Sequence, residues 1–354
     1  TIWASTQTPF PLRAQAAEAL GLAEEKVRVI PPFVGGGFGG KTFNQQAIEA
    51  ARLAKKTGRP VQVAWSRAEE FFYDTFRPAA VIDIDAGVGE GGRIAYWDFT
   101  TFFAGSRGAE HFYDIPHHRT VARPGGWRGG PGTHPFATGA WRAPGNNSNT
   151  FARESHIDVL AAAAGIDPVE FRRRNLKDPK MIRVLEATAE RFGWRPGRAA
   201  NGRGRGIALG VDAGTAVGLA VEVAVDRDSG RVRVERMVCV QDMGLAINPE
   251  GATIQMEGCL VMGLGYALKE EVRFAGGAVL DTNFDTYEIP RFSWLPALET
   301  VILDARSDPP QGGGEPAIIV VGAAIANAVF DAVGARVLRM PITPERLREA
   351  MRAG

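Results

Sequence analysis

Clustered glycine constrains the fold of this chain more than any other feature of its sequence. The chain has 43 glycines among 354 residues, whereas average use is about 7% of residues. They gather in three runs, GGGFGG at 35–40, RPGGWRGGPG at 123–132 and QGGGEP at 311–316. Because glycine lacks a Cβ, such runs favour loops whose backbone takes positive φ angles or closely approaches another group.

Charge and cysteine content exclude several classes of protein. The 41 Lys and Arg balance 40 Asp and Glu to a net charge of +1, which argues against an electrostatic nucleic-acid binder. We find no apolar run near the ~18 residues of a membrane span and no basic-then-apolar signal peptide. Two cysteines, Cys239 and Cys259, are too few for an iron–sulfur cluster, a structural zinc site or a disulfide framework. Redox chemistry would therefore need another route for its electrons.

Hydrophobic periodicity predicts both helices and strands along the chain. Helices are expected at 9–22, 43–58, 148–165 with Ser148 as N-cap, 167–176 with Asp167 as N-cap, 253–272, 319–334 and 343–353. Strands are expected at 2–4, 26–33, 61–66, 79–89, 93–104 and 299–304, with a hairpin at 218–242. Residues 105–139 show little periodicity and are expected to be irregular. The pattern predicts an α+β (mixed α/β) fold, in which helices cover mixed sheets.

A basic, glycine-rich stretch at 186–206 is the best candidate for an internal boundary. It follows the end of a helix and carries five arginines among its polar and small residues. We therefore divide the chain into a first domain at 1–200 and a second at 201–354.

The first glycine run matches a phosphate-binding pattern literally. GGGFGGKT at 35–42 satisfies GxxxxGK[ST], in which backbone amides and a lysine bind phosphate. A P-loop normally follows a strand directly, but Pro31 and Pro32 interrupt the approach, and Phe38 is atypical in such a loop. A P-loop nucleotide-binding module and a loop with purely structural glycines both stay open at this point.

The third glycine run carries one carboxylate, Glu315, just before an apolar helix. A carboxylate desolvated against that helix would be tuned toward the proton affinity of a general base. The alternative is a glutamate that stabilises the helix dipole from its N-terminal end.

Arg142 lies in a Pro/Gly turn before a helix. It is suited to hold an anionic or carbonyl-bearing ligand, or else it stacks on Trp141. The five histidines show no metal-ligand spacing such as HExxH, and the adjacent His117 and His118 are expected to pack in a loop. No GxSxG elbow supports Ser-His-Asp hydrolysis.

Four segments in order resemble one family. They are GGGFGGK, WRAPG followed by NTFARESHIDVLAAAAGIDPVEFRRRNL, QDMGLAINPEG followed by IQMEGCLVMGLGYALKEE, and QGGGEPAIIVVGAAIANAVFDAVG. Together they resemble the molybdenum-cofactor-binding (large) subunit of the xanthine dehydrogenase/aldehyde oxidase family, most of all the C-terminal portion of isoquinoline 1-oxidoreductase-type subunits. The resemblance implies that 1–200 and 201–354 are two molybdenum-cofactor-binding domains, the second of which carries the catalytic Glu loop.

The resemblance also implies a cofactor and a site. The cofactor is a molybdopterin-type molybdenum cofactor, in bacterial members often the cytosine dinucleotide form, whose dithiolene holds the metal, so no protein side chain is expected to ligate it. Glu315 matches the general base, Gln7 the glutamine near the metal, and Arg142 the turn that lines the active site. The positions that match cofactor-binding residues are Gly37, Phe38, Gly39, Gly40, Ala143, Gln255, Gly313 and Gly314.

The implied activity is that of a molybdenum hydroxylase. Such an enzyme oxidises an aldehyde or an N-heteroaromatic substrate with water-derived oxygen and passes electrons to a partner [2Fe-2S] subunit; any flavin or haem is expected on partner chains too. The competing interpretations are a catalytically inactive scaffold or assembly protein of the same fold and the P-loop module above. The compartment, cytoplasm or bacterial periplasm, is left open.

The sequence departs from the family pattern in three respects. Thr42 stands where purine-oxidising members have a second glutamate, so a xanthine-like substrate is not expected. Arg142 is not followed by the cysteine of CO-oxidising members. The segment that grips the phosphate side of the cofactor is missing, and we expect it in a companion polypeptide or in a further part of the same polypeptide.

Overall fold

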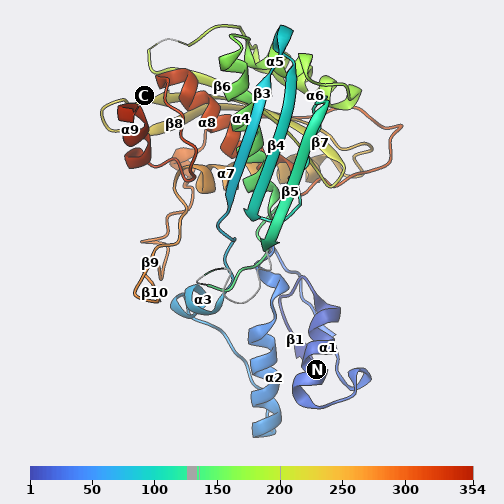
Figure 1. Ribbon diagram of the computed structural model, residues 1–354. Coiled ribbons are helices and arrows are strands. Elements are labelled where there is room, and N and C mark those ends of the chain that lie inside the picture. The colour runs from blue at the N-terminus through green and yellow to red at the C-terminus, as the bar shows by residue number, and fades with distance from the viewer. Residues whose placement is uncertain (126–133, 135, 200, 354) are drawn as a thin grey trace. The chain divides into compact units, whose positions relative to one another are not determined.

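The computed structural model describes residues 1–125, 134, 136–199 and 201–353 (Figure 1). They form two compact units, which are described separately. Unit 1 comprises Thr1–Pro78, the described residues between Trp127 and Arg142, and Val272–Thr286. Unit 2 comprises Ala79–Gly126, Ala143–Glu271 and Tyr287–Gly354, as far as described. Residues 126–132 of the second glycine run lie outside the described residues.

Unit 1 is built from short elements. Its strands are β1 (Ile2–Trp3), β2 (Val29–Ile30), β9 (Phe274–Ala275) and β10 (Ala278–Val279), and its helices are α1 (Pro9–Leu20), α2 (Gln45–Thr57) and α3 (Arg67–Tyr73). β1 pairs with β2 in parallel, and β9 with β10 antiparallel. As predicted, α1 and α2 end at Gly21 and Gly58, whose φ angles of +63° and +66° suit glycine.

Two strands predicted in unit 1 differ from the structure. The strand expected at 26–33 is reduced to β2, because Glu24–Lys26 form a 3-10 turn and Pro31 and Pro32 have no N–H to donate. Residues 61–66 form no strand, so that prediction is wrong. Alternation of apolar residues cannot by itself supply the partner whose hydrogen bonds make a strand.

The apolar core of unit 1 is small. Leu12, Ala16, Ala17 and Val27 are its buried members, and Ile48 of α2 packs against them. No residue of α2 is buried.

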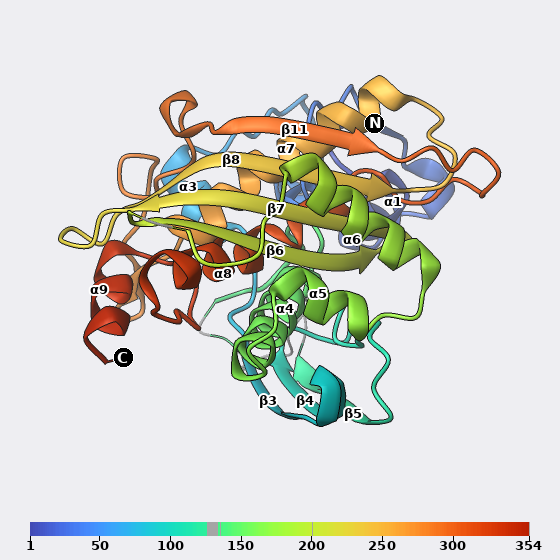
Figure 2. The same ribbon diagram turned by 90° about the horizontal axis from the view of Figure 1, so that it is seen from above.

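The main sheet of unit 2 contains a predicted hairpin and two further strands (Figure 2). Its order is β11-β8-β7-β6, with bounds β6 (Arg203–Asp212), β7 (Thr215–Val225), β8 (Val232–Asp242) and β11 (Ala297–Ile302). β6, β7 and β8 are antiparallel neighbours, and β11 runs parallel to β8. The β6–β7 turn, Ala213 and Gly214, takes φ angles of +47° and +81°, as a two-residue hairpin turn requires.

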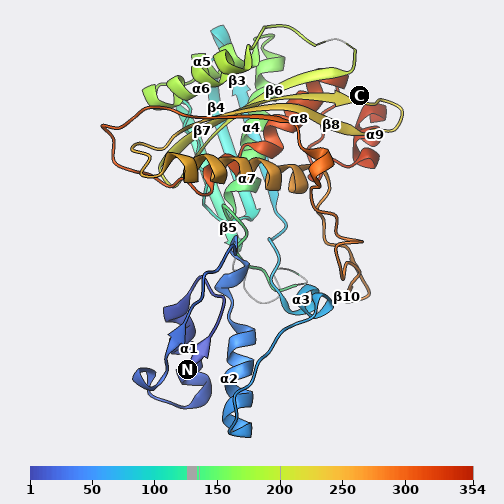
Figure 3. The same ribbon diagram turned by 180° about the vertical axis from the view of Figure 1, so that it is seen from behind.

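Helices cover both faces of this sheet. α6 (Pro179–Phe192) covers one face, where a Cβ on Gly218 would lie against the Thr188 hydroxyl. α8 (Val321–Val333) and α7 (Pro249–Leu268) pack on each other and lie on the other face (Figure 3). There a Cβ on Gly206 of β6 would overlap the carbonyl oxygen of Ala324, so glycine lets the α8 backbone approach the strand closely.

The stretch Pro316–Val333, which includes α8, corrects one prediction. By length and composition it is apolar enough to cross a membrane, with a mean hydropathy of 1.9, although the sequence analysis found no such run. In the structure 83% of the stretch is buried inside the protein. This extent of burial is typical of a helix in the core of a folded domain.

A second sheet in unit 2 has the order β3-β4-β5. β3 (Val81–Val88) and β4 (Ile94–Phe103) form the predicted antiparallel pair, and β5 (His117–Gly125) joins β4 in parallel. β5 corrects the expectation that 105–139 is irregular, and it also places His117 and His118 on a strand. A parallel strand depends on a partner distant in sequence, so local periodicity gave no signal for it.

The helices α4 (Asn146–Ala163), α5 (Pro168–Arg174) and α9 (Pro344–Ala353) complete unit 2. Asp167 caps α5 as predicted, accepting from the Val169 and Glu170 amides. Ser148 does not cap α4, whose N-cap is Gly145. The Asn146 side chain instead binds Asp212 of β6, so a tertiary contact takes precedence over a local cap.

The fold is thus the predicted mixture of helices and mixed sheets. The division at residue 200 into two cofactor-binding domains stays a prediction.

Candidate functional site

Gln7 and the first glycine run come together in unit 1. The N–H of Gly39 donates to Oε1 of Gln7 at 3.1 Å. Gly39 has φ +104°, and a Cβ there would overlap the backbone of Ala140. A Cβ on Gly37 would collide with the Gln7 side chain. Both positions therefore require glycine for the Gln7 amide to lie against the loop.

Phe38 and Gly40 form the open side of the same loop. Phe38 is 48% exposed and takes a φ of +51°, which is uncommon for a bulky side chain. A Cβ on Gly40 would meet no atom within 4 Å. The loop therefore presents a ring and an open stretch of backbone to a ligand.

The geometry of this loop differs from that of a P-loop. Lys41 Nζ donates to Ser5 Oγ at 2.9 Å and to the Val34 carbonyl at 3.0 Å. Gly40–Thr42 form a 3-10 turn, and α2 begins only at Gln45. The lysine thus closes the loop internally, and no α-helix N-terminus directly follows the glycines.

Arg142, from a distant part of the sequence, contacts the same loop and is 4% exposed. Its N–H donates to the Phe38 carbonyl at 2.8 Å, and its guanidinium carbon lies 5.4 Å from the centre of the Phe38 ring. The guanidinium carbon of Arg77 lies 5.5 Å from the centre of the Trp141 ring. Arg142 therefore supports the Phe38 loop.

In unit 2, Glu315 is held at both carboxylate oxygens. Oε1 accepts from the Ala143 N–H at 3.1 Å, and Oε2 accepts from Arg107 Nη2 at 2.6 Å. Ala143 is fully buried and takes a φ of +56°. The Glu315 side chain is 40% exposed, so it is less desolvated than the sequence analysis expected. The Glu315 side chain makes no capping hydrogen bond to the 3-10 turn that follows it, Pro316–Ile318.

Sequence reasoning missed Arg107 and its second partner, Asp212. Arg107 donates Nε and Nη2 to the two oxygens of Asp212 at 2.9 and 2.7 Å. Burial acts to lower the pKa of Arg107, but hydrogen bonds and charges from Asp212 and Glu315 outweigh it and raise that pKa. Arg107 lies in the aperiodic segment before β5, and no sequence motif marked it.

The loop that carries Glu315 is tied to neighbouring elements of unit 2. Gly312 N–H donates to the Ala213 carbonyl at 3.1 Å, and Thr215 Oγ1 donates to the Gly312 carbonyl at 2.6 Å. A Cβ on Gly313 would overlap Met243, and one on Gly314 would lie 3.9 Å from Oε1 of Gln255 on α7. Gln255 of α7 therefore lies near Gly314.

Cys259 of α7 supports this loop from the protein interior. Its Sγ lies 3.4 Å from the Gly314 carbonyl oxygen and 3.6 Å from that of Glu315. Burial raises the pKa of the other cysteine, Cys239, and the charge of Cys259 adds to this effect. Both cysteines are reduced and buried.

Among the described residues, no group of three or more His, Cys, Asp or Glu side chains is arranged to hold a metal ion. The exposed Phe38 ring, the open backbone at Gly40 and the exposed side chain of Gln7 suit an organic cofactor with many oxygen and nitrogen atoms. These three residues fit such a group.

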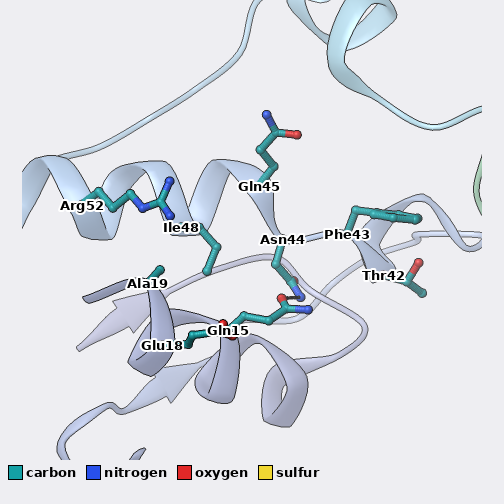
Figure 4. A pocket seen from close by; sticks show the side chains of 9 residues that line it. All are labelled: Gln15, Glu18, Ala19, Thr42, Phe43, Asn44, Gln45, Ile48 and Arg52. Carbon is teal, nitrogen blue, oxygen red and sulfur yellow. Dashed lines mark hydrogen bonds between the residues drawn. The ribbon is translucent and has the colours of Figure 1, made fainter. Parts of the chain in front are cut away.

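Unit 1 also has a pocket of about 740 Å³ between α1 and α2 (Figure 4). Asn44, which is 7% exposed, lies at its base and bonds Gln15 of α1 at 3.2 Å. None of the predicted site residues lines this pocket.

The fold has relatives among solved structures. Quinoline 2-oxidoreductase from Pseudomonas putida 86 superposes with a TM-score of 0.83 at 17% identity, over 99% of this chain and 72% of that one. This likeness shows the fold class.

Sequence comparison identifies the family. Two family models described as "Molybdopterin cofactor-binding domain" match residues 1–176 and 185–296. The chain is 34% identical to a nicotinate dehydrogenase subunit from Pseudomonas putida and 29% identical to the beta subunit of isoquinoline 1-oxidoreductase from Brevundimonas diminuta, each over 99% of its length. It spans 32% and 47% of those relatives. The chain belongs to the molybdenum-cofactor-binding subunits of the xanthine dehydrogenase/aldehyde oxidase family, as the sequence analysis predicted.

Proposed function

We propose that the chain is part of a molybdenum hydroxylase that oxidises an aldehyde or an N-heteroaromatic compound with oxygen derived from water. Family membership supports the cofactor. The relatives named for nicotinate and isoquinoline support an N-heteroaromatic substrate, while another relative is named aldehyde oxidoreductase.

The observation that carries the proposal is the fixed carboxylate of Glu315. A general base needs a defined direction toward the proton that it accepts. The Ala143 amide and Arg107 restrain the two oxygens at 3.1 and 2.6 Å, while the side chain keeps 40% exposure. Glu315 accepts a proton during turnover, and Arg107 and Ala143 hold its carboxylate in place.

A molybdopterin-type cofactor supplies the redox centre and the site of oxygen transfer when it is bound. The residues that would contact it are Gly37, Phe38, Gly39, Gly40, Ala143, Gln255, Gly313 and Gly314. Arg142 would line the active site. The glycines among these residues would permit a close approach of the cofactor to the backbone. We propose the cytosine dinucleotide form.

Electrons leave through a partner subunit that carries [2Fe-2S] clusters. The only two cysteines of the chain are both fully buried, and four thiolates are needed for one such cluster. A companion polypeptide supplies the remaining cofactor contacts, in keeping with the greater length of the relatives.

Glu315→Gln tests the function. The amide keeps the size of the side chain but accepts no proton, so turnover should fall by about 10² or more while the molybdenum content of the purified complex stays constant. Glu250→Gln, on the exposed first turn of α7, is the control and should keep full activity.

Two results would contradict the proposal. Near-normal turnover in Glu315→Gln would show that Glu315 is not the general base. A complex from the native source that contains no molybdenum would favour the scaffold or assembly protein.

A further inference from the structure

The Asp212 carboxylate accepts two hydrogen bonds from Arg107 and one from Asn146. Its side chain is 1% exposed. It accepts from Nε and Nη2 of Arg107 at 2.9 and 2.7 Å, and from Asn146 Nδ2 at 2.7 Å. A bidentate pair of this kind fixes the plane of the guanidinium, and Arg107 Nη2 then reaches Glu315 at 2.6 Å.

The same hairpin turn that places Asp212 also anchors the Glu315 loop. Asp212 ends β6 and is the register partner of Thr215 at the start of β7. Thr215 Oγ1 bonds the Gly312 carbonyl at 2.6 Å, and the Ala213 carbonyl accepts from Gly312 N–H at 3.1 Å. The carboxylates of Asp212 and Glu315 are therefore held in one framework of backbone and side-chain bonds.

We propose that Asp212 is a positioning residue for Glu315, which holds Arg107 in place and offsets its charge. The proposal rests on the proposed function of Glu315 as the base. An arginine beside a base restrains it but also favours its charged form, which makes it a poorer proton acceptor. Asp212 shares that arginine and reduces the net positive charge that Glu315 experiences.

Among the described residues of unit 2, three titratable groups contact Glu315 or its arginine. Arg107 comes from the segment between β4 and β5, and Asp212 from the β6–β7 turn. Cys259 of α7 faces the Glu315 carbonyl. The raised pKa of Arg107 keeps the guanidinium charged across the working pH range.

Asp212→Asn in the complete complex tests the proposal. Asparagine keeps the shape but not the charge, so Arg107 would favour the deprotonated Glu315 more strongly. We expect kcat to fall about tenfold or more, KM to change little, and the acid limb of the kcat/KM profile to move to lower pH. The molybdenum content should stay constant.

Arg107→Gln should shift the acid limb of the profile in the opposite direction. This variant still tests the proposal if Asp212→Asn does not yield folded protein. Without the guanidinium, Asp212 favours the neutral form of Glu315, so the acid limb should move to higher pH. A general loss of packing would not shift the two profiles in opposite directions.

Asp242→Asn is the matched control. Asp242 ends β8, its side chain is fully buried, and it pairs with Arg183 and Lys180 of α6. Its pH profile should match the wild type. The proposal is overturned if Asp212→Asn behaves like this control, or if Arg107→Gln leaves the acid limb in place. Retained turnover in Glu315→Gln would instead overturn the proposed function.

Discussion

The two units differ in how their apolar side chains are used. In unit 2, Trp97, Phe99 and Phe171 have no exposed surface and belong to one large cluster. In unit 1, Trp3, Phe10 and Phe33 are at least 71% exposed, and among the described residues the buried core cluster has four members. Since burial of apolar surface drives folding, unit 2 is stabilised by its interior, whereas unit 1 depends on a few contacts around α1.

The sharpest test of the interior of unit 2 is Glu154→Ala. The buried carboxylate accepts from Tyr113 Oη at 2.9 Å, Arg172 Nε at 3.1 Å and the Leu209 N–H at 3.0 Å. Its loss would leave the guanidinium of Arg172 buried beside a weaker partner, which costs about 3–5 kcal/mol. Hydrogen exchange should show faster opening of α4, α5 and β6.

The control for this prediction is Glu186→Ala. Glu186 pairs with Arg173 on the surface, with side chains 52% and 59% exposed. Exchange should barely change, because exposed ion pairs contribute little. Equal effects from the two variants would show that the buried pairs do not distinguish the interior of unit 2.

A smaller effect is expected from Leu12→Ala in unit 1. Leu12 is fully buried among Ala16, Ala17 and Val27, and truncation should cost about 2–3 kcal/mol. Exchange should rise in α1 and β2, while the peptides of the main sheet in unit 2 stay protected. The exposed Leu53 of α2 provides the matched control, since Leu53→Ala should leave exchange unchanged. Matching loss of protection in both units would mean that they unfold together.

The smallest expected effect is a dependence of unit 2 on pH. Burial lowers the pKa of His156, and the charge of Arg336 lowers it further. The ring packs edge to face on Trp97, 5.5 Å between centres. The unfolded chain, with a histidine pKa of about 6.5, therefore binds the proton first. Stability is present above that pH and is lost as the pH falls toward the folded value.

As the pH falls from about 7 to 5, the free energy that protects α4 from exchange should therefore decrease less in His156→Gln than in the wild type. The difference should be on the order of 1 kcal/mol. His117→Gln, at an exposed position, should leave the pH dependence intact. An unchanged slope in His156→Gln would mean that another group senses the pH.

The sequence predicted those parts of the fold that depend on neighbours along the chain. The glycines that end α1 and α2 and the β7–β8 hairpin were recognised because turn chemistry and period-2 alternation are local. β6 was not predicted, because its N-terminal part lies in the basic, glycine-rich stretch that was interpreted as a linker. β5 and the absence of a strand at 61–66 were not predicted either, because pairing depends on distant partners.

The candidate site divides in the same way. The four ordered segments predicted the family, and the resemblance then pointed to Glu315 and Gln7. The roles assigned to these residues stay predictions. Arg107 and Asp212 were missed because their meeting is a product of tertiary structure: 105 positions separate the two residues, and neither lies in a motif. Functional residues in aperiodic segments beside a sheet therefore cannot be found from sequence motifs or periodicity alone.

The close approach of β6 to α8 has a consequence for how this protein can vary. β6 ends at Asp212, and α8 follows the loop of Glu315. At Gly204 and Gly206 a side chain would overlap the α8 backbone. A mutation that moved β6 and α8 apart would therefore alter the spacing of Asp212 and Glu315, so we expect low tolerance to substitution at these two glycines.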